Sequence, residues 1–185
     1  MNIAHHAQLF QNAEPQYGLR DAMRRLTGGV SVITAGLGER RTGLTVTTAH
    51  SFSTEPPLMI ISVNRNASSH GVIVTHGHFC VNVLAANQKT VAERFSGFGG
   101  VKGAARYEGS SWSSLLTGAL ALDGALANVD CEVEERIERH SHSLFIGRVV
   151  FVRVSPKAGP QLVYQNGQYG SYQASTMPSQ EGICP

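Results

Sequence analysis

Six hydroxyl-bearing side chains lie within one short stretch of the chain, at positions 45, 47, 48, 51, 53 and 54. They precede the Pro56-Pro57 step, and the next apolar run, 58–63, contains Ser62 and is followed by Asn64. Hydroxyl and amide groups can hydrogen-bond both the polar edge of a ring and a phosphate without supplying charge. We therefore expect this stretch to bind a ligand that combines these two groups.

Two histidine pairs are a second candidate for chemistry. His76 and His78, like His140 and His142, stand two positions apart, so both imidazoles of a pair share one face if the segment is extended. Such pairs could bind zinc, given a third ligand and an open coordination position. No aspartate, glutamate or cysteine stands at matching spacing, so we expect ordinary surface histidines and no metal site.

Composition narrows the class of protein. A chain of 185 residues with 42% hydrophobic residues can form one domain with a real core. The net charge is only +2 and the basic residues are scattered, so nucleic acid is not an expected partner. Cys80, Cys131 and Cys184 are far apart, which favours buried thiols and a reducing, cytoplasmic location. No run has the apolar length of a signal peptide or of a membrane span, so no membrane partner is expected.

The elements that must position these side chains are mainly strands. Apolar residues at helical spacing predict helices only at 19–26 and 85–95. The glycine-rich stretch 97–103 lacks the Lys-Ser or Lys-Thr pair of a phosphate loop and is interpreted as a surface loop, while 115–126 fits helix or loop. Strands are expected at 30–34, 44–48, 58–63, 79–84, 127–139, 143–154 and 162–164, with a hairpin turn at Asn166-Gly167.

Seven or so strands with helices only in their connections indicate a closed or nearly closed antiparallel barrel. The chain shows no βαβ alternation, which disfavours a doubly wound nucleotide-binding fold. We expect a flexible lead-in at 1–18, one domain at 19–172 and a polar tail with little order at 173–185.

Motifs spread over residues 19–170 together resemble the flavin reductase-like family. In chain order they are Gly28–Thr34, Gly43–Ser51 with Pro56-Pro57, Phe79–Leu84 with Gln88 and Phe95, Arg106-Tyr107, Ile146–Val149, Leu162–Tyr164 and Gly167–Tyr169. The resemblance implies an FMN-binding split barrel of Greek-key type, mainly β, with a few short helices. It also implies a homodimer in which both subunits complete each site.

The implied activity is that of an NAD(P)H:flavin oxidoreductase. Such an enzyme transfers a hydride from NADH, or NADPH, to FMN or FAD and supplies reduced flavin to a separate monooxygenase. Matched by position, Thr45, Val46, Thr47 and Thr48 would face the isoalloxazine and ribityl groups. Ser62 and Asn64 would lie under the flavin chain, Arg65, Ser68 and Ser69 would hold the phosphate, and Val81 and Asn82 would line the ring.

Two departures from the family pattern concern the nicotinamide. The family often carries Gly-Asp-His where this chain has His140-Ser141-His142. The resemblance implies that His142 is the catalytic histidine, which would orient the nicotinamide or protonate the reduced flavin; a structural role is the alternative. The arginine that the family often has near the end of the barrel is missing, which leaves Tyr169 as a wall of the nicotinamide pocket.

Two other functions remain open from the sequence. One is a non-catalytic flavin-binding protein of the same fold. The other is a flavin-dependent reductase whose acceptor is a metal ion or a corrin cofactor. NADH consumption with added flavin distinguishes the three.

Overall fold

The computed structural model describes residues 17–157 and 159–174, so the expected lead-in and tail lie almost entirely outside the described residues. The described chain folds around a seven-stranded antiparallel sheet in the order β3-β2-β6-β9-β10-β5-β4. Its strands are β2 (Ser31–Ala35), β3 (Thr42–Val46), β4 (His50–Thr54), β5 (Pro57–Asn64), β6 (His78–Val83), β9 (Ala127–Arg139) and β10 (His142–Val154).

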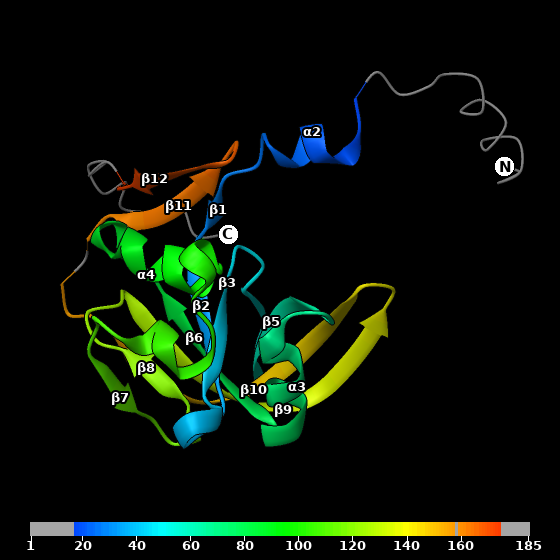
Figure 1. Ribbon diagram of the computed structural model, residues 1–185, viewed down its shortest axis with the longest axis vertical. Coiled ribbons are helices and arrows are strands. Elements are labelled where there is room, and N and C mark those ends of the chain that lie inside the picture. The colour runs from blue at the N-terminus through cyan, green and yellow to red at the C-terminus, as the bar shows by residue number, and fades with distance from the viewer. Residues whose placement is uncertain (1–16, 158, 175–185) are drawn as a thin grey trace, which may run out of the picture.

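The sheet curls into an open barrel. Strands β3 and β4 follow one another in the chain yet form the two opposite edges of the sheet, and they do not pair with each other. This is the split-barrel arrangement, which confirms the predicted fold class (Figure 1). The fully buried side chains of Ile33, Ile61, Phe79 and Phe145 fill its interior.

Strands β9 and β10 are each 13 residues long and extend beyond β6, while β5 pairs with β10 as far as His142. Their joined ends form a hairpin that projects from the body, in yellow in Figure 1. His140, at the turn, has a positive φ of 48°. The side chains near this tip are therefore presented away from the core of the chain.

A second, three-stranded sheet lies across one end of the barrel (Figure 1). It consists of β1 (Gly28–Gly29), β11 (Gln161–Gln165) and β12 (Gln168–Tyr172). Asn166 and Gly167 join β11 to β12 with φ values of 49° and 81°, which confirms the predicted hairpin turn. The helix α2 (Leu19–Met23) precedes β1 and is shorter than predicted.

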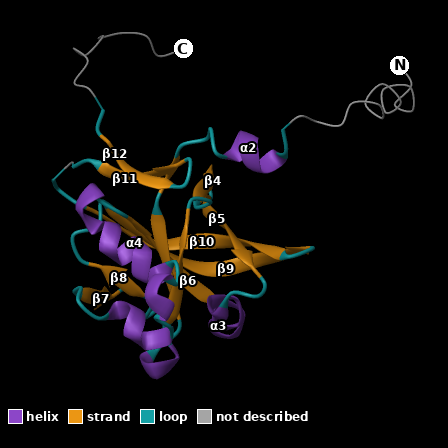
Figure 2. Ribbon diagram, turned by 45° about the horizontal axis from the view of Figure 1, so that its top comes forward, coloured by secondary structure: helices purple, strands orange, loops and turns teal. Residues whose placement is uncertain are grey.

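The helices lie in the connections, as Figure 2 shows. The predicted helix at 85–95 is confirmed as a 3-10 turn, η2 (Ala86–Gln88), followed by α4 (Lys89–Phe95). The helix α3 (Ser68–His76) and strand β4 were not predicted. The stretch 115–126, for which the sequence fitted either helix or loop, contains the strand β8 (Leu120–Leu122). It pairs with β7 (Trp112–Ser114) in a small hairpin. The other 3-10 turns are η1 (Gly38–Arg40), η3 (Phe98–Gly100) and η4 (Gly103–Tyr107).

Cys80 and Cys131 are fully buried, as predicted. Burial raises the pKa of the Cys131 thiol to about 12 and that of Cys80 well above its usual value. Both side chains are therefore neutral packing groups. In the part of the chain that the structure describes, no helix is both long enough and apolar enough to cross a membrane.

Candidate functional site

The threonines of the opening stretch lie where β3 leaves the barrel. The hydroxyl of Thr45 donates a hydrogen bond to the carbonyl of Ala92 in α4, at 2.6 Å. The hydroxyl of Thr48 donates to the carbonyl of Ser62 in β5, at 3.3 Å. Thr47 lies against β1, where a Cβ placed on Gly28 would stand 2.8 Å from its Cβ. The stretch therefore touches a helix, the second sheet and β5, the strand next to the opposite edge of the barrel.

A cavity of about 390 Å³, which we call the ring cavity, opens beside these threonines. Thr45, Val46 and Thr47 form one wall, and Tyr164 and Tyr169 of the β11–β12 hairpin form another. The two tyrosine rings pack edge to face, with centroids 5.1 Å apart. Burial, and then the nearby Glu93, raises the pKa of Tyr169, so its phenol stays neutral. The volume suits a planar ring, and apart from Glu93 the lining side chains are apolar or neutral polar.

Phe98 also lines this cavity, and sequence reasoning did not find it. Its side chain is 74% exposed, and it stands between Gly97 and Gly99, which have φ values of 88° and 71°. An exposed aromatic side chain at the mouth of a cavity can stack on a planar ligand. The only sequence signal was a single phenylalanine within a glycine-rich stretch.

A second cavity, of about 410 Å³, lies between α3 and the tip of the β9–β10 hairpin. We call it the hairpin cavity; Arg65, Asn66, His70, His140 and Ser141 line it.

Ser69, in the first turn of α3, is only 1% exposed, and its Oγ is buried without a hydrogen-bond partner. A helix N-terminus carries partial positive charge and unsatisfied N–H groups, which favour an anion. Among the described residues this hydroxyl has no partner, and Ser69 does not itself line the hairpin cavity.

The positive charge at the hairpin cavity comes from Arg65. Its guanidinium lies 3.5 Å from Glu138, 3.4 Å from the carbonyl of His140, and 48% of its side chain is exposed. The nearby His70 is within hydrogen-bonding distance of Ser143 Oγ, at 2.8 Å. Burial, and then the charge of Arg136, lowers the pKa of His70. At neutral pH, Arg65 is therefore the cation that an anionic ligand would meet.

Other residues of the predicted site lie close to the hairpin cavity. Asn64 uses its side-chain oxygen to accept a hydrogen bond from the backbone N–H of Asn66, at 2.8 Å. His142 pairs with Asn64 across β10 and β5, is exposed, and approaches Ser141 Oγ through Nδ1 at 2.9 Å. Ser68 is exposed at the start of α3. His142 thus belongs to the hairpin end, whereas Tyr169 lines the ring cavity.

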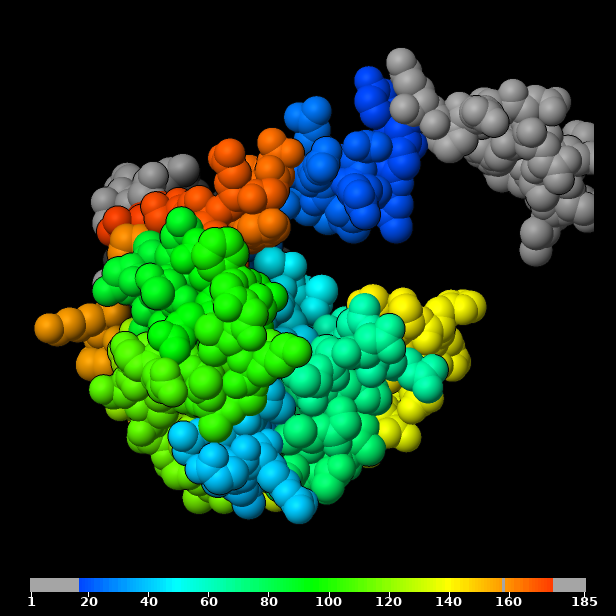
Figure 3. All heavy atoms as spheres, in the orientation of Figure 1, coloured from blue at the N-terminus to red at the C-terminus, as the bar shows by residue number. Residues whose placement is uncertain are grey.

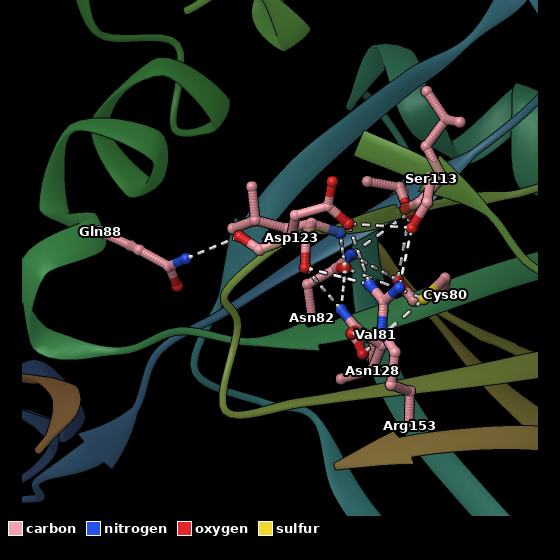
Figure 4. Close-up of polar contacts among 11 residues, drawn as sticks. Cys80, Val81, Asn82, Gln88, Ser113, Asp123, Asn128 and Arg153 are labelled. Carbon is pink, nitrogen blue, oxygen red and sulfur yellow. Dashed lines mark hydrogen bonds and ion pairs between the residues drawn. The ribbon is translucent and has the colours of Figure 1, made fainter. Parts of the chain in front are cut away.

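Val81 and Asn82 are not with this group, because both side chains are fully buried. The amide of Asn82 donates to the carbonyl of Val32 at 3.0 Å and accepts from the N–H of Leu122 and from Asn128 Nδ2, each at 2.7 Å. Figure 4 shows this network, which continues through Arg153 to Ser113 and Asp123. With these bonds formed, Asn82 offers no surface to a ligand, so we leave both residues out of the proposed site.

The histidine pairs differ from expectation in one respect. His78 is only 8% exposed rather than a surface residue, and its Nε2 is buried without a partner. Burial, and then the charge of His76, lowers its pKa. No cluster of three or more histidine, cysteine, aspartate or glutamate side chains within 17–157 and 159–174 is arranged to hold a metal ion.

The open barrel, with the ring cavity and the hairpin cavity beside it, defines a split-barrel protein with room for a ligand. Comparison with known proteins identifies its family. Residues 23–173 match the family described as "Flavin reductase like domain". This chain belongs to that family.

Two solved structures and one curated relative illustrate the match. The chain is 34% identical over 151 residues to the FMN reductase (NADH) RutF of Agrobacterium fabrum, covering 81% of this chain and 84% of the relative. It superposes with a TM-score of 0.77 and 30% identity on BorF, the flavin reductase component of a bacterial two-component tryptophan halogenase, covering 85% and 98% of the two chains. The NADH:FAD oxidoreductase SgcE6 of Streptomyces globisporus, solved with NAD and FAD fragments, superposes with a TM-score of 0.77 and 26% identity, covering 86% and 93%.

Proposed function

We propose that this protein is an NADH-dependent flavin reductase that transfers a hydride to FMN or FAD and supplies reduced flavin to a separate monooxygenase. The observation that carries the proposal is the ring cavity, which the predicted Thr45, Val46 and Thr47 line together with Tyr169. Thr48 bonds the carbonyl of Ser62 on β5, the strand that leads to Arg65 at the hairpin cavity. The named activities of the relatives support the same conclusion.

The residues fit a phosphorylated flavin at both ends. The Thr45–Thr48 stretch and Tyr164 accommodate the ring, and Ser62 and Asn64 lie beside the connecting chain. Arg65 of the hairpin cavity, with Ser68 and Ser69 in the neighbouring first turn of α3, would hold the phosphate. A bound flavin supplies the hydride-accepting chemistry. The contribution of the chain is to fix the ring, bind the phosphate and exclude water from the ring cavity.

The direct test follows NADH consumption under air by the purified protein with FMN, FAD or riboflavin. Flavin-dependent oxidation of NADH supports the proposal, and NADPH in a parallel assay establishes the donor. A protein that binds flavin yet oxidises neither nucleotide would instead be a binding protein of the same fold. Turnover that requires an added metal or corrin complex would make it a flavin-dependent reductase of a metal or corrin acceptor.

We further propose that the protein acts as a homodimer whose subunits share each site. His142 projects on the β9–β10 hairpin, while Tyr169 lines the ring cavity of the same chain, and no cavity found in residues 17–157 and 159–174 is lined by both. A composite site would bring the His142 of one subunit to the Tyr169 side of the other.

A complementation experiment tests this arrangement. His142→Ala and Tyr169→Ala are each expected to lower kcat/KM by roughly tenfold or more, because each removes a group that positions the nicotinamide. Mixed dimers of the two variants are expected to regain activity, since one of their two sites carries both substitutions and the other carries neither. The measurement is NADH oxidation after the two variants are unfolded and refolded together.

Variants refolded separately and then combined provide the control for this experiment. If refolding together restores no activity although mixed dimers form, the two residues belong to one subunit's site and the shared arrangement is wrong.

A further inference from the structure

Two arginines of α2 line a third cavity, of about 630 Å³, which we call the α2 cavity. Arg20 and Arg24 stand one turn apart on the helix, and Thr47, Thr48 and His50 face them from the β3–β4 segment. Figure 3 shows the hollow between α2, in dark blue, and this segment, in cyan. The α2 cavity shares Thr47, Tyr164 and Gly167 with the ring cavity, so the two spaces adjoin.

The charge of the α2 cavity is positive, because Arg20 and Arg24 line it. Among residues 17–157 and 159–174, no acidic side chain lines it. Within the described residues, neither Arg20 nor Arg24 forms an ion pair, so both side chains can meet an anionic ligand; the same is true of Arg25 outside this cavity. The one acidic residue of the helix, Asp21, instead accepts a hydrogen bond from the N–H of Gly18 at 2.9 Å.

Hydrogen bonds hold the helix in this position. The N–H of Asn166 donates to the carbonyl of Arg24 at 3.1 Å, and Gln165 Nε2 donates to the carbonyl of Arg25 at 3.0 Å. Both donors belong to the β11–β12 hairpin, which also carries Tyr164 and Tyr169. The backbone that follows α2 is thus tied to the same hairpin that forms a wall of the ring cavity.

A hydride-transfer site must hold two anionic ligands at once. The flavin phosphate has its cation in Arg65, at the hairpin cavity. The donor dinucleotide carries two further negative charges on its pyrophosphate, several bonds away from the nicotinamide. Planar guanidinium groups bind such oxygens well, and Arg20 and Arg24 are the arginines that adjoin the ring cavity on its other side.

We propose that Arg20 and Arg24 bind the pyrophosphate of the nicotinamide dinucleotide and direct its nicotinamide into the ring cavity. The inference rests on the proposed reductase function. It adds a binding subsite for the hydride donor that is separate from the flavin phosphate site. It also gives α2, which has no buried residue, a role in substrate recognition.

The test compares the double variant R20Q/R24Q with R25Q. Arg25 lies in the turn that follows α2 and does not line the α2 cavity; it lines a neighbouring space with Tyr17, Asp21 and Arg24. The probe is ADP-ribose, which keeps the pyrophosphate and lacks the nicotinamide. In R20Q/R24Q, the Kd for ADP-ribose and the KM for NADH are expected to rise about tenfold or more. The kcat at saturating NADH and the Kd for FMN should stay unchanged, and R25Q should behave as the wild type.

Several outcomes would overturn the inference. They are an unchanged ADP-ribose Kd in R20Q/R24Q, an equal loss in R25Q, or a loss of FMN binding that matches the loss of ADP-ribose binding. A wild-type protein that oxidises no NADH with any flavin would instead remove the proposed reductase function. The FMN Kd and the thermal midpoint of each variant report whether it is folded, so a folding defect is separated from a binding defect.

Discussion

Replacing Arg65 with alanine is expected to weaken the binding of FMN about tenfold or more and to leave the binding of riboflavin nearly unchanged. The guanidinium is the cation at the hairpin cavity, which lies beside the N-terminal end of α3. Riboflavin has the same ring and ribityl chain as FMN but no phosphate. Titration of flavin fluorescence against each protein measures both dissociation constants.

Arg136→Ala is the matched control for this experiment. Arg136 contacts the same carboxylate as Arg65, with its Nη2 3.3 Å from Glu138 Oε1, but it does not line the hairpin cavity. Removing it changes the charge of the hairpin by the same amount and should leave FMN binding close to that of the wild type. If Arg65→Ala weakens the binding of riboflavin as much as that of FMN, Arg65 supports the structure of the hairpin rather than contacting the phosphate. The assignment of Arg65 to the phosphate site is then wrong.

The strands could be predicted from the sequence because their signals are local. Alternation along residues 127–139 and 143–154, the apolar run at 58–63 and the turn at Asn166-Gly167 each specify an element without reference to the rest of the chain. The order of the strands is not a local property. The split-barrel arrangement was implied only by the resemblance to a family, and β4, one of the two sheet edges, was not predicted at all.

Helix α3 illustrates what local signals miss. Its sequence contains Val72, Val74 and Thr75, which favour strands, and a glycine at 71. Its helical form depends on tertiary packing, because Ile73 is fully buried in the barrel core. Ser69 could be singled out from its motif, but its place in the first turn of a helix could not.

The roles of polar residues on strands are equally hard to predict from local sequence. A hydroxyl or amide on a strand can meet a ligand, solvent or a distant part of the protein, and the sequence does not say which. Thr45 donates its hydroxyl to α4, and Asn82 is covered by the β7–β8 hairpin some 40 residues later. Both contacts come from segments whose position depends on the whole fold.

Replacing Asn82 with alanine is expected to destabilise the protein by about 3 kcal/mol and to lower its thermal midpoint by roughly 6–12 °C. The side chain is fully buried, and its loss leaves the N–H of Leu122 and the carbonyl of Val32 without these partners inside the protein. Water cannot reach these groups without opening the packing of the β7–β8 hairpin. Thermal unfolding followed by circular dichroism measures the change.

The affinity for flavin separates this structural role from direct contact with the ring. Below its unfolding transition, Asn82→Ala is expected to bind FMN with the dissociation constant of the wild type. Ser113→Ala, at the half-buried rim of the same network, is the control and should cost no more than about 1 kcal/mol because solvent can replace its hydroxyl. An Asn82→Ala protein with wild-type stability and weakened FMN binding would show that Asn82, and with it strand β6, contributes to the flavin site.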